Sequence, residues 1–208
     1  MPKRHFLPGF PRSHRMLLAF SGFVLILSVA MGYGTWTADP VLAKNAIEQV
    51  IQEQFTGLIE KMAKLSWWGQ FLIIFLNNLK ATVLIMLSGA FLPFLPLMVG
   101  VLPNGFIIGL LAGLYEYERV LPKSTFFLSL LPHGLFEIPA ILLAATIGII
   151  WGVRNWRSIF KADSGRPSWG DHAKRSLAFV PLLVALLVIA ALVEVLVTPL
   201  FFKLPRFT

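Results

Sequence analysis

The residues of this chain best suited to chemistry are a few polar side chains inside long apolar segments. Seven such groups occur there: Lys80, His133, Glu137, Glu194, Asn77, Asn78 and Asn104. Each is costly to place in hydrocarbon, so each is a candidate for function by default. Counted at about 1.5 Å per residue along a helix, most fall near the middle or the outer half of their segments. We therefore expect one cluster that contains Asn77, Asn104, His133, Glu137 and Glu194.

His133 and Glu137 are four residues apart and would share one face of a continuous helix. An imidazole and a carboxylate at this spacing can hold a metal, relay a proton or simply pair with each other. The stretch HGLFE lacks the second histidine of a metalloprotease motif, and too few ligands are in sight for a metal site. We expect these polar groups to satisfy one another, with no metal and no cofactor. Lys80 lies nearer the cytoplasmic end, where its long side chain can reach water.

No pattern in the sequence points to catalysis. There is no serine, histidine and aspartate order, no phosphate-binding loop and no cysteine nucleophile, because the chain has no cysteine. Ser129 stands four residues before His133, but a serine in an apolar span usually bonds its own backbone. We expect no enzymatic activity.

The composition predicts an all-α, multi-pass membrane protein. Of 208 residues, 57% are hydrophobic and only 13% are charged, and the mean hydropathy is +0.76. The formal charge of +8 comes mostly from loops and tails, and no basic polar face of the kind that binds nucleic acid is visible. The partner implied by these numbers is the lipid bilayer.

About five transmembrane helices fit the pattern. Residues 1–15 form a basic arm, and residues 16–36 are long enough to span, with no good cleavage site after them. Residues 37–66 form an extracytoplasmic segment, and residues 67–200 form a four-span core with a basic cytoplasmic loop at 153–176. A short tail follows at 201–208.

Two of these spans carry a Pro-X-Gly sequence near the middle. The two sequences are Pro103-Asn104-Gly105 and Pro132-His133-Gly134. Proline removes a backbone donor and clashes with the preceding turn, whereas glycine loosens the backbone. We therefore expect broken helices near 103–105 and 132–134, whose freed carbonyl groups are satisfied by protein or water.

Residues 39–66 read as an amphipathic helix outside the hydrocarbon. Asp39 is a good N-cap and Pro40 suits the first helical position. Apolar residues recur at helical spacing from Ile47 to Leu65, and charged residues fill most of the rest. Such a helix either lies at the interface over its own bundle or offers a docking face to a partner's helix, and we favour the first.

The distribution of basic residues predicts the orientation. Basic residues gather in the amino-terminal arm and in the 153–176 loop, and five spans place both regions on one side. We expect a cytoplasmic amino terminus and an extracytoplasmic carboxyl terminus in the cell membrane.

Four motifs, taken in order, resemble the stage II sporulation protein M family. They are FLNNLKAT (75–82), PNGFIIG (103–109), LPHGLFEIPA (131–140) and VEVLVTP (193–199). The resemblance covers roughly residues 70–200 and implies about five spans. It places the family pattern on Asn77, Asn78, Asn104, Gly105, Pro132, His133, Gly134, Glu137, Glu194 and Pro199.

The resemblance implies a role in a membrane complex. The namesake protein of that family is implied to anchor two peptidoglycan-degrading partners at the sporulation septum during engulfment, without catalysis of its own. We therefore expect a non-enzymatic scaffold or partner in an envelope-remodelling complex. The alternative is a transporter or permease-like component that uses the intramembrane Asn/His/Glu cluster as a substrate or proton site.

Overall fold

The computed structural model describes residues 12–57, 61–62, 64–117, 123–160 and 178–197. Within these ranges all the regular structure is helical, as the composition predicts. The elements, in chain order, are α1 (Arg12–Ala38), α2 (Pro40–Val50), η1 (Ile51–Thr56), α4 (Trp67–Phe91), η2 (Leu97–Val101), α5 (Leu102–Tyr117), α6 (Lys123–Phe160) and α8 (Val180–Leu196). The segments η1 and η2 are π-helical.

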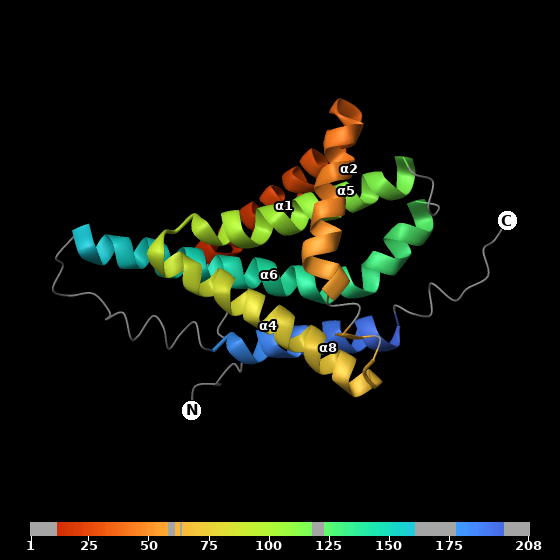
Figure 1. Ribbon diagram of the computed structural model, residues 1–208. Coiled ribbons are helices and arrows are strands. Elements are labelled where there is room, and N and C mark those ends of the chain that lie inside the picture. The colour runs from red at the N-terminus through yellow and green to blue at the C-terminus, as the bar shows by residue number, and fades with distance from the viewer. Residues whose placement is uncertain (1–11, 58–60, 63, 118–122, 161–177, 198–208) are drawn as a thin grey trace.

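Helix α6 lies at the centre of the arrangement. On one side α1 and α5 pack closely together, and on the other side α4 and α8 pack against α6 and against each other (Figure 1). Helix α2 contacts α1 and α5 and runs across them. The molecule therefore has two helical groups that share α6.

Successive long helices alternate in direction. Helix α1 runs parallel to α5, because Leu25 lies beside Gly105 and Trp36 lies beside Gly113. Helix α4 runs parallel to α6, because Met86 lies beside Gly148 and Pro93 lies further along beside Gly152. Helix α8 runs opposite to α6 (Figure 1). The order α1, α4, α5, α6, α8 thus passes back and forth through the bundle.

Local chemistry sets several helix starts. The Asp39 carboxylate accepts a hydrogen bond from the Leu42 backbone N–H at 3.0 Å, and Pro40 fills the first turn of α2, as the sequence predicts. Ser66 caps α4 in the same way, since its hydroxyl accepts from the Gly69 N–H at 3.4 Å. Trp67 and Trp68 follow this cap with exposed side chains, which is typical of a membrane interface.

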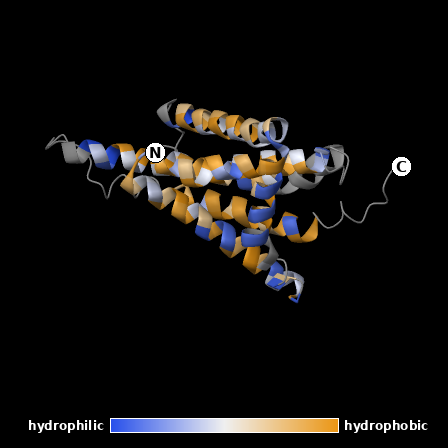
Figure 2. Cartoon of the chain, turned by 45° about the horizontal axis from the view of Figure 1, so that its top comes forward, coloured by the Kyte–Doolittle hydropathy of each residue, from blue (hydrophilic) through white to orange (hydrophobic). Residues whose placement is uncertain are grey.

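Four of the helical segments are long and apolar enough to cross a membrane. They are His14–Ala38, Trp67–Phe91, Leu97–Tyr117 and Gly134–Arg157. Helix α8 is also apolar, and its described part has 17 residues, or about 26 Å. Apolar residues cover most of the length of the long helices (Figure 2).

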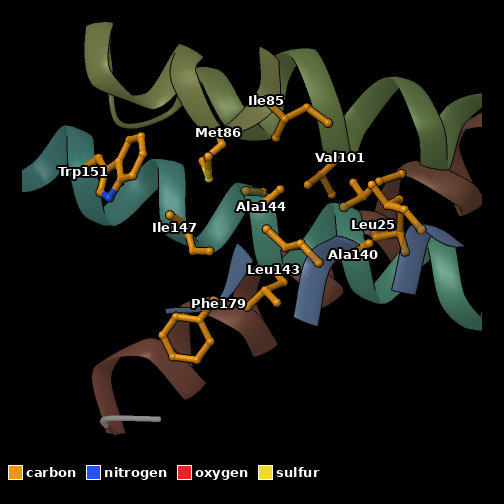
Figure 3. Close-up of a cluster of buried hydrophobic side chains, with 14 residues drawn as sticks. Leu25, Ile85, Met86, Val101, Ala140, Leu143, Ala144, Ile147, Trp151 and Phe179 are labelled. Atoms are coloured by element: carbon orange, nitrogen blue, oxygen red, sulfur yellow. The ribbon is translucent and has the colours of Figure 1, made fainter. Parts of the chain in front are cut away.

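The largest buried cluster joins both helical groups (Figure 3). Leu25 of α1, Ile85 of α4 and Val101 of η2 meet the alanine-rich face of α6 around Ala144. Ala140, Ala144 and Ala145 are fully buried. Small side chains on α6 let neighbouring helices approach its backbone closely, which is how helices associate in lipid.

The closest approach is between α4 and α6. A Cβ atom on Gly89 would overlap the backbone of Gly148, and one on Gly152 would overlap the carbonyl oxygen of Gly89. Asn155 and Trp156 of α6 strengthen this contact: the Asn155 Nδ2 donates to the Ala90 oxygen at 2.9 Å, and the Trp156 indole donates to the Phe91 oxygen at 2.8 Å. Carbonyl groups at a helix end lack partners in their own helix, so α6 completes the end of α4.

Glycines also form the contact between α1 and α5. Gly105, Gly109 and Gly113 face Leu25, Val29 and Trp36, and a Cβ atom at any of the three would overlap α1. Ser28 adds a hydrogen bond from its hydroxyl to the Leu102 oxygen at 2.6 Å. The glycine spacing on α5 therefore serves helix packing.

The break expected at 103–105 is wrong in position. Residues 102–117 form one α-helix, and the departure from α geometry lies just before it, in η2. There the Leu102 N–H bonds the Leu97 oxygen, five residues back. Because Pro103 has no N–H, a wider turn before it causes less disruption than a break at the proline itself.

The break expected at 132–134 is also wrong, because α6 is continuous from Lys123 to Phe160. Figure 1 shows that α6 instead changes direction in its first half, the part that contains Pro132, Gly134 and Pro139. Proline in a helix interior bends the helix when neighbours hold both arms in place. The same helix extends through residues 153–160, which we had expected to belong to a loop.

The α4–α6 contact leads to a stability prediction. Gly89→Ala should lower the stability by about 1–3 kcal/mol, because backbone atoms of Gly148 occupy the space of the new methyl group. Unfolding by dodecyl sulfate, followed by circular dichroism, measures the effect. Gly22→Ala in α1 is the matched control: a Cβ there meets nothing within 4 Å, so stability should hold or rise. Equal effects of the two changes would contradict the packing argument.

Candidate functional site

The two asparagines of α4 point in different directions. Asn77 is exposed on the surface of the helix. Asn78 is half-buried and shares the face of Ile74, Thr82 and Ile85, which are buried against neighbouring helices. Its amide nitrogen Nδ2 is buried and has no hydrogen-bond partner among the described residues. Of this pair, only Asn78 is therefore directed into the bundle.

Asn104 has a local role at the start of α5. Its Nδ2 donates a hydrogen bond to the Gly100 oxygen at 2.8 Å, across the junction between η2 and α5. Gly105 beside it is buried against α1. Among the described elements, α5 packs against α1, α2, η2 and α6 and not against α4 or α8. Asn104 therefore stabilises the turn before Pro103 and does not join the α4 or α8 residues.

The family motif in α6 is helical throughout. Pro132 and His133 lie in the continuous helix, and their side chains fall outside the described residues. Gly134 is loosely packed, since a Cβ there would meet only the end of the Ile138 side chain at 3.3 Å. Glu137 is half-buried, and its oxygen Oε2 is shielded from solvent. Its position one turn before Ala140 and Ile141 places it on the face of α6 that packs in the core.

Glu194 occupies the corresponding place on α8. It is half-buried and follows Leu187, Ala190 and Ala191 at helical spacing, and all three are fully buried. Glu194 is thus directed to the bundle interior. Both Glu194 and Glu137 take part in polar, aromatic or electrostatic interactions. Pro199 lies outside the described residues.

The single cluster of five residues does not form as expected. Asn77 faces outward and Asn104 bonds the backbone just before its own helix, which removes two of the five. Asn78, Glu137 and Glu194 remain on the facing sides of α4, α6 and α8. Ile74 packs with Ala191 on antiparallel helices, so Asn78 lies opposite residue 187 and about 10 Å from the level of Glu194. The polar groups therefore line one interface at different depths.

The arrangement offers no ready metal centre. Within the described residues, no three His, Cys, Asp or Glu side chains gather closely enough to hold a metal ion. The interface instead places polar side chains between packed helices, where each is costly unless it finds a partner.

Several polar contacts were missed by the sequence reasoning. The Tyr33 hydroxyl donates to Glu116 Oε2 at 2.6 Å and joins the ends of α1 and α5. The Trp36 indole donates to the Leu110 oxygen at 2.9 Å, and its ring stacks on Tyr117. The glycine spacing of α5 was the available signal, since it implies a closely packed neighbour whose polar residues must find partners.

Comparison with known proteins gives the family. The family described as stage II sporulation protein M matches residues 20–199. This range contains every described helix except the first residues of α1. The chain belongs to the stage II sporulation protein M family. The chain is also similar to an uncharacterized protein of Methanocaldococcus jannaschii, to which it is 32% identical over 127 residues, which are 61% of this chain and 69% of the relative. No solved structure matches this stage II sporulation protein M family member.

The asparagines lead to a prediction with opposite signs at two sites, Asn104 and Asn78. Asn104→Leu should lower stability by about 1 kcal/mol, because the Gly100 oxygen loses its donor. Asn78→Leu should leave stability equal or higher, since the buried amide nitrogen has no partner to lose. Asn77→Leu, at an exposed position, is the control. Dodecyl sulfate unfolding measures all three, and a large loss for Asn78→Leu would show that its amide is bonded within the bundle.

Proposed function

We propose that this protein is a non-enzymatic scaffold in a membrane complex that remodels the cell envelope. Its membership of the stage II sporulation protein M family supports this role. The structural observation that carries the proposal is the α2–η1 arm. This arm is a polar helix fixed across the apolar bundle, with a surface that the bundle does not use.

The inner face of the arm is bound to its own chain. Ala43 and Ile47 are fully buried against Trp36 and Leu110. Further along, Met62 packs with Phe71 of α4. The described part of the apolar stripe, at Ala43, Ile47 and Met62, is therefore occupied, which favours the interpretation that this helix lies over its own bundle. The earlier alternative, docking through that stripe, does not apply to these residues.

Beyond the exposed Val41 and Leu42 in the first turn of α2, the outer face of the arm is polar and accessible. Its exposed side chains include Asn45, Glu48, Gln49, Gln52 and Glu53. The Gln49 amide donates to Glu53 Oε1 at 2.8 Å, which holds two of these side chains in place along the helix. A partner with a polar or basic surface would meet a rigid platform there, because Ala43 and Ile47 anchor the helix from beneath.

We also propose that the arm is extracytoplasmic. Arg15 at the start of α1 and Arg157 near the end of α6 lie at one end of the bundle, and the arm follows the other end of α1. The positive-inside rule places the arginine end in the cytoplasm.

Orientation can be tested with single cysteines, since the natural chain has none. Gln52→Cys should react with a membrane-impermeant maleimide on intact cells, because its exposed side chain lies on the arm. Arg157→Cys, also exposed, should react only after the cells are permeabilised. The reverse pattern of labelling would invert the proposed orientation.

The scaffold role predicts a defined contact surface. A photo-crosslinking amino acid in place of Gln52 should capture a specific envelope-remodelling protein in intact cells. The same amino acid in place of Phe23, which is exposed on α1, should capture lipid or nothing. Glu48→Arg should reduce the Gln52 crosslink without lowering protein levels, because it reverses the charge on the platform while Ile47 stays in place. Equal crosslinking of the same protein from positions 52 and 23 would contradict the proposal that the arm is a specific contact surface.

The alternative, a transporter, is favoured by one observation. Asn78, Glu137 and Glu194 lie on the facing sides of three packed helices, a position typical of substrate or proton sites. The purified chain in sealed vesicles would then carry a proton flux that Glu137→Gln abolishes. If this proton flux is found and the Gln52 crosslink is absent, the transporter becomes the better proposal and the scaffold role is wrong.

A further inference from the structure

One turn of the chain is apolar and unusually exposed for a connection between helices. Residues 92–96 join α4 to η2, and no Asp, Glu, Lys or Arg occurs between residues 81 and 115. Phe91 is 75% exposed and Phe94 is 55% exposed. A connection that lay in water would normally carry polar residues, so this turn faces an apolar environment.

This apolar turn is attached to a basic part of α6. Asn155 and Trp156 donate hydrogen bonds to the carbonyl groups of Ala90 and Phe91. Arg154 and Arg157 flank these two residues and, being three apart, share one face of the helix. Trp156 is itself exposed, as tryptophans at a headgroup layer often are.

Helix α1 brings further basic charge to the same place. Arg154 lies close enough to His14 for an electrostatic interaction, and Arg15 follows His14 with an exposed side chain. The start of α1, the end of α4 and residues 154–157 of α6 therefore meet at one end of the bundle. We call this region the basic end; it comprises His14, Arg15, Phe91, Phe94 and residues 154–157.

Negative charge is concentrated away from the basic end. The described carboxylates are those of Asp39, Glu48, Glu53, Glu116, Glu137 and Glu194. The first four belong to the α2–η1 arm or to the last turn of α5, and Glu194 ends α8. Since α5 runs parallel to α1 and α8 runs opposite to α6, these positions lie toward the other end of the bundle. Glu137 lies in the first half of α6.

We propose that the basic end is a binding site for anionic phospholipids. Arg15 and Arg157 bind the phosphate groups, and Phe91 and Phe94 lie among the upper acyl chains beside them. Arginine suits phosphate because its planar fork can donate two hydrogen bonds at once. The apolar turn favours a lipid over a soluble phosphate as the ligand, because a soluble phosphate would leave Phe91 and Phe94 exposed to water.

The test compares thermal unfolding and lipid retention of the full chain in two bilayers. One bilayer is phosphatidylcholine, and the other also contains phosphatidylglycerol. Phosphatidylglycerol should raise the unfolding temperature of the natural protein and co-purify with it. The double variant Arg15→Gln and Arg157→Gln should bind phosphatidylglycerol roughly 30-fold more weakly, since each basic residue at an anionic surface contributes about a factor of five.

Two matched variants keep the test decisive. Lys61→Gln with Lys64→Gln removes the same charge from two exposed residues just before α4, and should retain the lipid effect. Arg15→Lys with Arg157→Lys keeps the charge and should retain most of it. An equal loss of phosphatidylglycerol binding in the Lys61 and Lys64 variant would overturn the proposed site, because the binding of the lipid would then depend only on the net charge of the protein.

The source of the phosphate is tested separately. Inorganic phosphate added to the phosphatidylcholine bilayer should not reproduce the stabilisation. If it does, the ligand is a soluble anion and the proposal of a lipid site is wrong. If the purified chain shows no preference for phosphatidylglycerol, the apolar turn is covered by a protein partner instead, which also overturns the proposal.

Discussion

The close approach of two backbones, α4 and α6 at Gly89 and Gly148, is the contact on which the rest of the bundle depends. Lipid offers no hydrophobic driving force between helices, so van der Waals contact and hydrogen bonds must hold them together. Glycine at Gly89, Gly148 and Gly152 brings the helices near enough for Asn155 and Trp156 to reach the end of α4. That connection fixes the turn at 92–96 and thereby the start of η2 and α5. Helix α1 then follows α5 through its own row of glycines.

Much of this architecture could be predicted from residue patterns. Apolar length indicated where the long helices lie, and Asp39 with Pro40 marked the start of α2. What the patterns could not give was the response of the helices to proline. Pro103 is accommodated by the π-helical segment η2, which directly precedes α5, and Pro132 lies in a bent but continuous helix. Both outcomes depend on the neighbours that hold the helix, and a single sequence does not name those neighbours.

The candidate site was predicted less well, for a related reason. Depth along a helix can be counted from the sequence, but the direction of a side chain around the helix needs the packing partner. Asn77 and Asn78 are at nearly equal depth, yet one faces outward and the other faces the core. Asn104 is at a similar depth and serves the backbone of its own turn. Glu137 and Glu194 do lie toward the interior. Glu137 stands one turn before the buried Ala140 and Ile141, and Glu194 stands one turn after the buried Ala190 and Ala191.

The way that α6 completes α4 has a consequence for biosynthesis. The carbonyl groups of Ala90 and Phe91 receive donors that lie 65 residues later in the chain. At about 5 to 20 residues per second, the ribosome takes roughly 3 to 13 seconds to make that interval. During this time the carbonyl groups of Ala90 and Phe91 lack these donors. A chain that stops before α6 therefore lacks both the glycine contact and the hydrogen bonds that complete the end of α4.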